Sequence, residues 1–159
     1  MTGHTDFKGV YPILYSFFDK SGQLDRAAMR RQVEGCIAGG AHGITVMGLA
    51  TEVGKLDVNE RRKVIDWVGE DINGRVPYAV TVGEGSVPGQ IEFVKAAIAA
   101  GANWAILQPP AILGVPEIEY VRFLGNVADT TDLPLAVQNA PGVMATSLSN
   151  GGLKTLNKN

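Results

Sequence analysis

Short apolar runs alternate along this chain with helix-patterned segments, and this alternation limits the possible folds more than any other feature. The expected strands are residues 10–18, 43–47, 76–82, 104–107 and 133–137. The expected helices are residues 24–38, 57–70, 87–100, 116–129 and 147–156. Because the connections are short and no antiparallel hairpin is evident, the pattern predicts an α/β fold with a parallel sheet.

An internal repeat supports this reading. Ile37-Ala38-Gly39-Gly40-Ala41 precedes the second expected strand, and Ile98-Ala99-Ala100-Gly101-Ala102 precedes the fourth. The offset is 98 − 37 = 61 positions, which is two units of about 30 residues, the length of a βα repeat. The sequence therefore predicts consecutive βα units.

Local signals place several helix ends. Asp57 with Glu60 three residues later predicts a capping box, and Ser86 predicts a second N-cap. The pair Gly39-Gly40 predicts the end of the first helix, because glycine adopts the left-handed conformation at low cost.

The length and composition indicate a single domain, residues 1–159, of ordinary globular character. Apolar residues make up 45% and charged residues 19% of the chain, and the formal net charge is -2, which argues against a general attraction to nucleic acid or to an anionic membrane. Cys36 is the only cysteine, and the first residues lack the apolar region of a signal peptide. We therefore expect a cytoplasmic protein.

Length alone favours an open doubly wound sheet over a barrel. A doubly wound sheet of five strands could be complete in 159 residues, whereas a (β/α)₈ barrel typically needs ~250. In either fold, ligand sites lie at the carboxyl ends of the parallel strands. The loop Gly48-Leu49-Ala50-Thr51-Glu52-Val53-Gly54-Lys55-Leu56 directly follows the second expected strand. This loop is therefore the first candidate site.

The order of several short motifs resembles the dihydrodipicolinate synthase / N-acetylneuraminate lyase family of class I aldolases. The motif residues are Asp19, Gly22, Leu24 and Asp25; Gly48, Glu52 and Leu56; Glu60-Arg61; Ala100-Gly101-Ala102; and Leu133, Pro134, Asn139 and Pro141. The resemblance covers essentially the whole chain. It implies an α/β fold of the TIM (β/α)₈-barrel family, present here as about the first five βα units of an incomplete barrel.

The resemblance also implies a reaction. Family members are lyases or aldolases that act on pyruvate or a 2-keto-3-deoxy acid through a lysine Schiff base. The family's lysine is expected on a sixth strand, beyond residue 159, and Lys154 and Lys158 do not replace it. We therefore expect the N-terminal part of a longer enzyme, inactive alone. The alternative is a family member with altered or no catalysis that binds keto acids or forms oligomers.

The family's site residues map onto changed side chains. The two hydroxyl residues that hold the substrate carboxylate are replaced by Leu49 and Ala50, whose backbone amides can still bind it. Thr51 stands at a usual glycine position, so its shifted hydroxyl could compensate in part. Gln138 occupies the position of the proton-relaying tyrosine, and an amide can donate but cannot titrate. Val143 stands where the synthases carry an arginine, which disfavours a dicarboxylic partner.

Other polar residues receive plainer interpretations. Glu52 is expected to bond nearby amides and hold its loop, and Glu84 to cap a helix or bond within its loop. His4 and His42 do not form a metal site by their placement. We expect no metal and no cofactor, a small 2-keto acid as ligand, no nucleic-acid or membrane partner, and a homo-oligomer, either a dimer or a tetramer.

Overall fold

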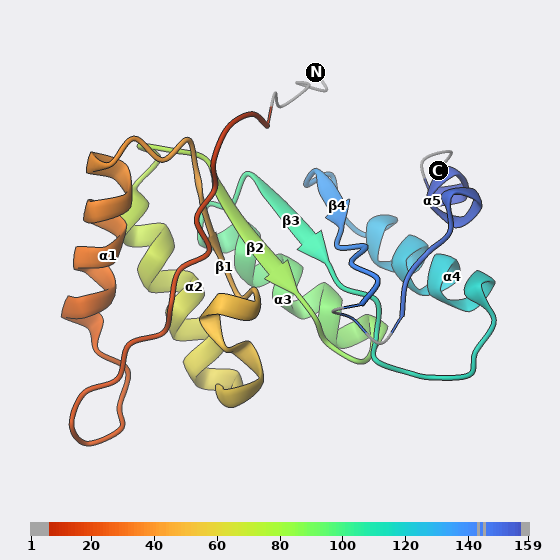
Figure 1. Ribbon diagram of the computed structural model, residues 1–159, viewed down its shortest axis with the longest axis horizontal. Helices are drawn as coiled ribbons and strands as arrows, with labels where there is room; N and C mark the ends of the chain where they lie inside the picture. Colours follow the sequence, from red (N-terminus) through yellow and green to blue (C-terminus); the bar gives the residue numbers. More distant parts are fainter. Residues whose placement is uncertain (1–6, 143, 145, 157–159) are drawn as a thin grey trace.

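The computed structural model describes residues 7–142, 144 and 146–156, and it contains a parallel four-stranded sheet (Figure 1). The strands are β1 (Ile44–Val46), β2 (Tyr78–Val82), β3 (Trp104–Leu107) and β4 (Leu135–Val137). They lie in the order β1-β2-β3-β4, and every neighbouring pair is parallel.

One helix precedes β1, others connect the strands, and the last follows β4. They are α1 (Arg26–Ala38), α2 (Val58–Ile72), α3 (Val87–Ala99), α4 (Glu117–Ala128) and α5 (Asn150–Leu156). Two short 3₁₀ helices, η1 (Leu49–Thr51) and η2 (Val53–Lys55), lie between β1 and α2. The predicted α/β alternation is confirmed. In the described part of the chain, no helix has the length and apolarity that a membrane crossing requires.

The strand order distinguishes the two candidate architectures. A doubly wound sheet reverses its strand order at a switch point, whereas this sheet advances in one direction from β1 to β4. Right-handed crossovers between successive adjacent strands place all connecting helices on one side of the sheet, as Figure 1 shows for α2, α3 and α4. The sheet is therefore part of a barrel wall, as the family resemblance implies and contrary to the argument from length alone.

The first predicted strand is corrected. Residues 10–18 form an extended segment beside β1 with a single parallel bridge, Ile13 to Thr45. The backbone N–H of Thr45 donates to Pro12 O at 3.0 Å, and that of Leu14 donates to Thr45 O at 3.0 Å. Pro12 has no N–H to extend this ladder. The segment was expected to be buried on both faces, but Leu14 is its only buried residue.

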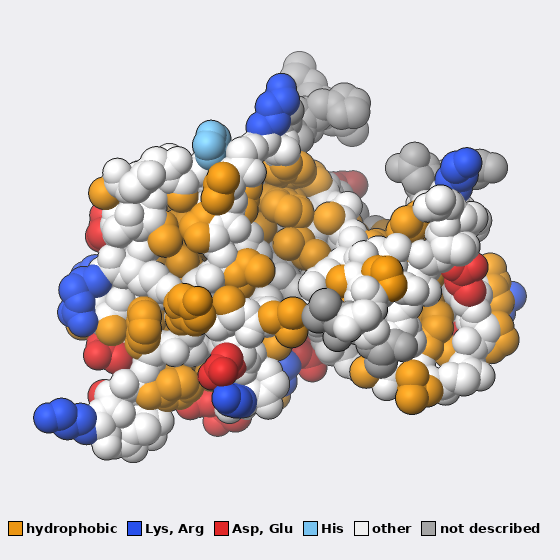
Figure 2. Space-filling view, in the orientation of Figure 1, with side chains coloured by type: hydrophobic (Ala, Val, Ile, Leu, Met, Phe, Trp, Pro, Cys, Tyr) orange, Lys and Arg blue, Asp and Glu red, His pale blue; other side chains and the backbone are white. Residues whose placement is uncertain are grey.

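The exposed side of this segment is apolar. Figure 2 shows hydrophobic side chains gathered across the middle of the face drawn, over the N-terminal segment and the strands. Exposed large apolar residues of the segment are Val10, Ile13, Tyr15, Phe17 and Phe18. The buried core instead lies between the sheet and its helices.

The predicted helix caps are present. Asp57 Oδ1 accepts from the N–H of Glu60 at 2.8 Å, and Glu60 Oε2 accepts from the N–H of Asp57 at 2.9 Å, which completes the capping box. Ser86 Oγ accepts from the N–H of Gly89 at 3.2 Å at the start of α3. After α1, Gly40 adopts the left-handed conformation with φ 82°. These short-range predictions are confirmed.

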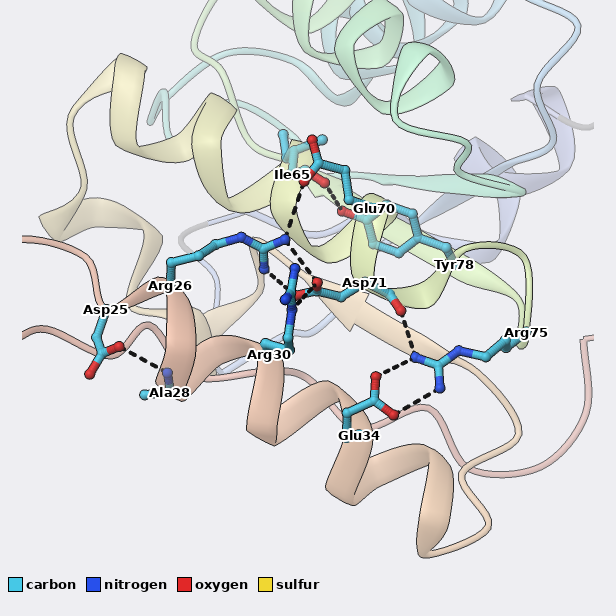
Figure 3. A network of polar contacts seen from close by, with 10 residues as sticks. All are labelled: Asp25, Arg26, Ala28, Arg30, Glu34, Ile65, Glu70, Asp71, Arg75 and Tyr78. Carbon is cyan, nitrogen blue, oxygen red and sulfur yellow. Dashed lines mark hydrogen bonds and ion pairs between the residues drawn. The ribbon is translucent and has the colours of Figure 1, made fainter.

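A network of charged side chains joins α1 to α2 (Figure 3). The Asp71 carboxylate is bonded by both terminal nitrogens of Arg26 and, at 2.9 Å, by Arg30 Nε. Arg75 forms a two-point pair with Glu34, at 2.8 and 2.6 Å, and also donates to the Asp71 carbonyl at 2.6 Å. Burial raises the pKa of Asp71, but the arginine hydrogen bonds outweigh it and hold the pKa below its usual value.

Candidate functional site

The loop after β1 folds into two short helices at the carboxyl end of the sheet. Gly48 precedes η1, and its carbonyl accepts the first helical hydrogen bond from the N–H of Thr51 at 3.1 Å. The amides of Leu49 and Ala50 come before that bond, so the helix itself does not use them. Leu49 is exposed and Ala50 is partly buried. The loop thus places these two amides at the edge where barrel sites form.

The Thr51 side chain does not face that edge. It is fully buried, and its Oγ1 donates to Leu14 O at 2.7 Å. Ser16 Oγ donates to the Thr51 carbonyl at 2.9 Å, so the residue joins the loop to the N-terminal segment at two points. The Thr51 hydroxyl was expected to compensate in part for the hydroxyls that Leu49 and Ala50 lack. The structure corrects this expectation, because the hydroxyl donates its hydrogen bond to the Leu14 carbonyl.

Replacement of Thr51 by valine is expected to lower the free energy of unfolding by about 1 to 2 kcal/mol, because Leu14 O loses its donor while the side-chain volume is kept. Thr51→Ser retains the hydroxyl and serves as the control. Urea denaturation of both variants measures the effect. Because Thr51→Ser also loses a buried methyl group, the decisive comparison is with the parent: a valine variant as stable as the parent would contradict a structural role for this hydroxyl.

Glu52 shapes the loop through its backbone conformation, and not through the predicted hydrogen bonds of its carboxylate. It has a left-handed conformation, φ 55°, and connects η1 to η2. Its Oε1 pairs with Lys55 Nζ at 3.0 Å, whereas the sequence predicted bonds from its carboxylate to nearby amides. Gly48 is packed against the Ile13 side chain, so the loop and the N-terminal segment are in direct contact.

Three residues form a row one position beyond the ends of β2, β3 and β4. The register pairs Val82 with Leu107 and Leu107 with Val137. The next residues are therefore Gly83, Gln108 and Gln138. The backbone N–H of Gln108 donates to Val82 O at 2.8 Å, and that of Gln138 donates to Leu107 O at 2.9 Å, so the ladder extends through this row.

The side chains of this row interact. Gln108 Nε2 donates to Gln138 Oε1 at 2.8 Å, and both residues are partly buried. Leu107 and Val137 line the space between the strands and α4, α5. Because successive strand residues point to opposite faces, the two glutamines face the other side of the sheet, which the helices do not cover. The predicted site residue Gln138 is thus brought into contact with a residue that sequence analysis did not select.

Gln90, which was not predicted as a site residue either, supports this row from α3. Gln90 in α3 is fully buried, and its Nε2 donates to Gln108 O at 2.8 Å and to Glu84 O at 3.0 Å. The Glu84 side chain forms an ion pair with Arg61. The predicted role, helix capping or a bond within its own loop, is therefore corrected to a bridge between the loop after β2 and α2. A small cavity of about 130 Å³ at this end of the sheet is lined in part by Arg61, Glu84 and Gln108.

The remaining predicted residues lie as follows. Asn139 bonds Leu148 through both side-chain atoms, at 2.9 and 2.8 Å, and so anchors the segment after β4. His42 Nδ1 accepts from the N–H of Val10 at 3.1 Å. His4 and Val143 lie outside the described residues, so the interpretations of these two positions stay predictions. Among the residues that are described, no group of three or more His, Cys, Asp or Glu side chains could hold a metal ion.

Of the two glutamines that were not predicted, only Gln108 carries a signal in the sequence, and it is weak. Gln108, like Gln138, directly follows the last apolar residue of a strand. In a parallel sheet these positions share one edge, so their proximity could have been predicted once the strand ends were known. Gln90 carries no such signal, because nothing in the sequence distinguishes a buried glutamine in a helix from an exposed one.

Comparison with known proteins places this geometry in a family. The family model described as "Dihydrodipicolinate synthetase family" matches residues 6–159. A 4-hydroxy-tetrahydrodipicolinate synthase of Thermus thermophilus is 34% identical over 137 residues, which is 86% of this chain and 46% of that protein. The putative 2-dehydro-3-deoxy-D-gluconate aldolase YagE of Escherichia coli is 27% identical over 150 residues, covering 94% of this chain and 50% of YagE.

Solved structures agree. A crystal structure of a dihydrodipicolinate synthase superposes with a TM-score of 0.90 at 28% identity and covers 96% of this chain and 52% of that one. The crystal structure of YagE in complex with pyruvate gives a TM-score of 0.89 at 27% identity, over 96% of this chain and 51% of that one. The chain spans about half the length of the curated relatives it matches. It belongs to the dihydrodipicolinate synthetase family.

Proposed function

We propose that this chain supplies the keto-acid-binding loop of a lyase or aldolase that acts on pyruvate or a 2-keto-3-deoxy acid through a lysine Schiff base. One observation carries the proposal. The family's G-x-x-x-E-x-x-x-L loop, here residues 48–56, is separated from the end of β1 by one residue, so the amides of Leu49 and Ala50 lie near the carboxyl edge of the sheet. Backbone N–H groups can bind a carboxylate whatever the side chain is. YagE, a family member, has been solved with pyruvate.

The proposed chemistry needs a lysine that lies outside residues 1–159. The lysine amine attacks the keto carbon of pyruvate, and water leaves, which gives an iminium that accepts electrons when the adjacent C–C bond forms or breaks. Lys154 does not fit this role, because it is exposed on α5 and not at the carboxyl end of a strand. Gln138 is placed to donate a hydrogen bond but not to relay a proton.

Borohydride trapping tests the proposal. The protein that carries this chain is incubated with pyruvate and sodium borohydride, digested and analysed by mass spectrometry. We expect a single lysine, outside residues 1–159, to gain the mass of one reduced pyruvate. Samples without pyruvate or without borohydride are the controls. Complete absence of the adduct at saturating pyruvate would overturn the Schiff-base mechanism.

A second candidate function is keto-acid binding without aldolase turnover, in a family member that keeps the scaffold and assembles as a homo-oligomer. The observation that favours it is the state of the hydroxyls, since Leu49 and Ala50 have none and Thr51 donates its own to Leu14. Calorimetry with a panel of 2-keto acids separates the two functions. Binding without an adduct or turnover supports the second function, and measurable turnover refutes it.

A further inference from the structure

The pairing of Gln108 with Gln138 has a fixed direction. An added Cβ at Gly83 would lie less than 3.0 Å from Gln108 Oε1, so this oxygen is seated directly over the glycine. A Cα–H group is a weak donor toward an oxygen and offers nothing to an NH₂ group. The oxygen of Gln108 therefore belongs on the Gly83 side, and its Nε2 belongs on the Gln138 side, where it donates at 2.8 Å.

The position of Gln108 is itself fixed from below. Its carbonyl accepts from the buried Gln90 Nε2 at 2.8 Å, and its N–H donates to Val82 O at 2.8 Å. The backbone of Gln108 is thus held on both sides. This fixes where the side chain starts, and the contact of its oxygen with Gly83 sets the direction of its amide.

This direction determines what Gln138 presents. Its Oε1 accepts from Gln108 Nε2, and its own Nε2 donates no hydrogen bond within the described part of the chain. The nitrogen of a planar amide points away from the oxygen, so Nε2 is directed away from Gln108. We infer that Gln108 is a positioning residue that makes Gln138 a non-titrating hydrogen-bond donor for an oxygen of the bound 2-keto acid. The inference rests on the proposed function for the identity of the ligand.

The consequence is a site that differs chemically from one built on tyrosine. A tyrosine at position 138 could give up and take up a proton, whereas the Gln138 amide held by Gln108 does neither and only donates a hydrogen bond. The acceptor that suits it is a carboxylate or keto oxygen. We therefore expect ligand binding through Gln138 to be independent of pH across the range in which a phenol or carboxyl in its place would titrate.

The substitution Gln108→Glu tests this directly, because a carboxylate has the same shape but cannot donate. The Gln138 amide must then turn to donate its Nε2 to the introduced carboxylate, which directs its oxygen at the ligand. At neutral pH the pyruvate dissociation constant, measured by calorimetry on the protein that carries this chain, is expected to rise at least about tenfold. Gln23→Glu, at an exposed glutamine, is the matched control.

Lower pH is expected to reverse the loss, and the amide exchange described below separates the restored hydrogen bond from the simple removal of the introduced charge, which would otherwise repel pyruvate. Once it is protonated, the carboxyl introduced by Gln108→Glu donates to Gln138 Oε1 again, so pyruvate affinity is expected to recover as the pH falls. The charged groups that line the cavity beside Gln108 are Arg61 and Glu84, and they form an ion pair with each other. The parent and Gln23→Glu proteins should show no such recovery over the same pH range.

Side-chain amide NMR gives a readout that does not need activity. In the unliganded parent, the Nε2 protons of Gln108 should exchange slowly and those of Gln138 quickly, with assignments from the Gln108→Met and Gln138→Met variants. In Gln108→Glu the Gln138 protons should become protected. The reverse order in the parent, or unchanged pyruvate affinity in Gln108→Glu at every pH, would overturn the inference. Absence of pyruvate binding in a parent with the expected exchange pattern would instead overturn the proposed function and, with it, the assigned ligand, but not the positioning by Gln108.

Discussion

Replacement of Asp71 by alanine is expected to lower the free energy of unfolding by about 2 to 3 kcal/mol. The Asp71 side chain is 3% exposed and receives hydrogen bonds from Arg26 and Arg30. Its removal leaves the partly buried Arg26 without its main partner. Arg30, which is 61% exposed, can turn to water, so the expected loss is below that of a fully buried pair. Urea denaturation measures it.

The same carboxylate gives a pH signature. Its pKa is lower in the folded than in the unfolded protein, because the arginine hydrogen bonds outweigh burial. The stabilisation is therefore present above the unfolded pKa, about 4, and is lost as the pH falls through the folded pKa. The stability difference between the parent and Asp71→Asn should shrink below about pH 4.

Glu92→Ala is the control for this experiment, because Glu92 forms only an exposed pair with Lys95, and its loss should cost less than about 0.5 kcal/mol. Equal effects of the Asp71 and Glu92 substitutions would show that the network between α1 and α2 contributes no more than an ordinary surface pair.

Gly69→Ala is expected to destabilise the protein by about 2 kcal/mol, although alanine favours a helix over glycine by about 1 kcal/mol. A Cβ on Gly69 would lie less than 3.0 Å from the carbonyl oxygen of Ala100, which ends α3. Backbone cannot move aside as a flexible side chain can, so α2 and α3 would have to separate. Thermal and urea denaturation measure the loss.

Gly35→Ala is the matched control. Gly35 also lies inside a helix, α1, but an added Cβ would meet nothing within 4 Å. This variant should be more stable than the parent by up to about 1 kcal/mol. If both alanine variants changed stability in the same direction, the close approach of α2 to α3 would not be what requires glycine at position 69.

The candidate site was only partly predictable from the sequence. The motif residues Gly48, Glu52 and Leu56 identified the loop and the family, because a motif depends only on residue types and their spacing along the chain. The use of the Thr51 hydroxyl could not be predicted, since its partner, Leu14, lies 37 residues away on another segment. The Gln108–Gln138 pair, 30 residues apart, depended on which strands are neighbours and on their register.

The sequence by itself determined the features that depend on near neighbours. The α/β alternation, the capping box of Asp57 and Glu60 and the N-cap of Ser86 follow from periodicity and from bonds that span three residues. Only the tertiary structure decided between a barrel wall and a doubly wound sheet, because strand order is a relation between distant segments. It also decided that residues 10–18 are extended and, except for Leu14, not buried, since burial depends on what packs against a segment and not on its own apolarity. The amide that Gln138 presents was decided in the same way, by a neighbour on the adjacent strand.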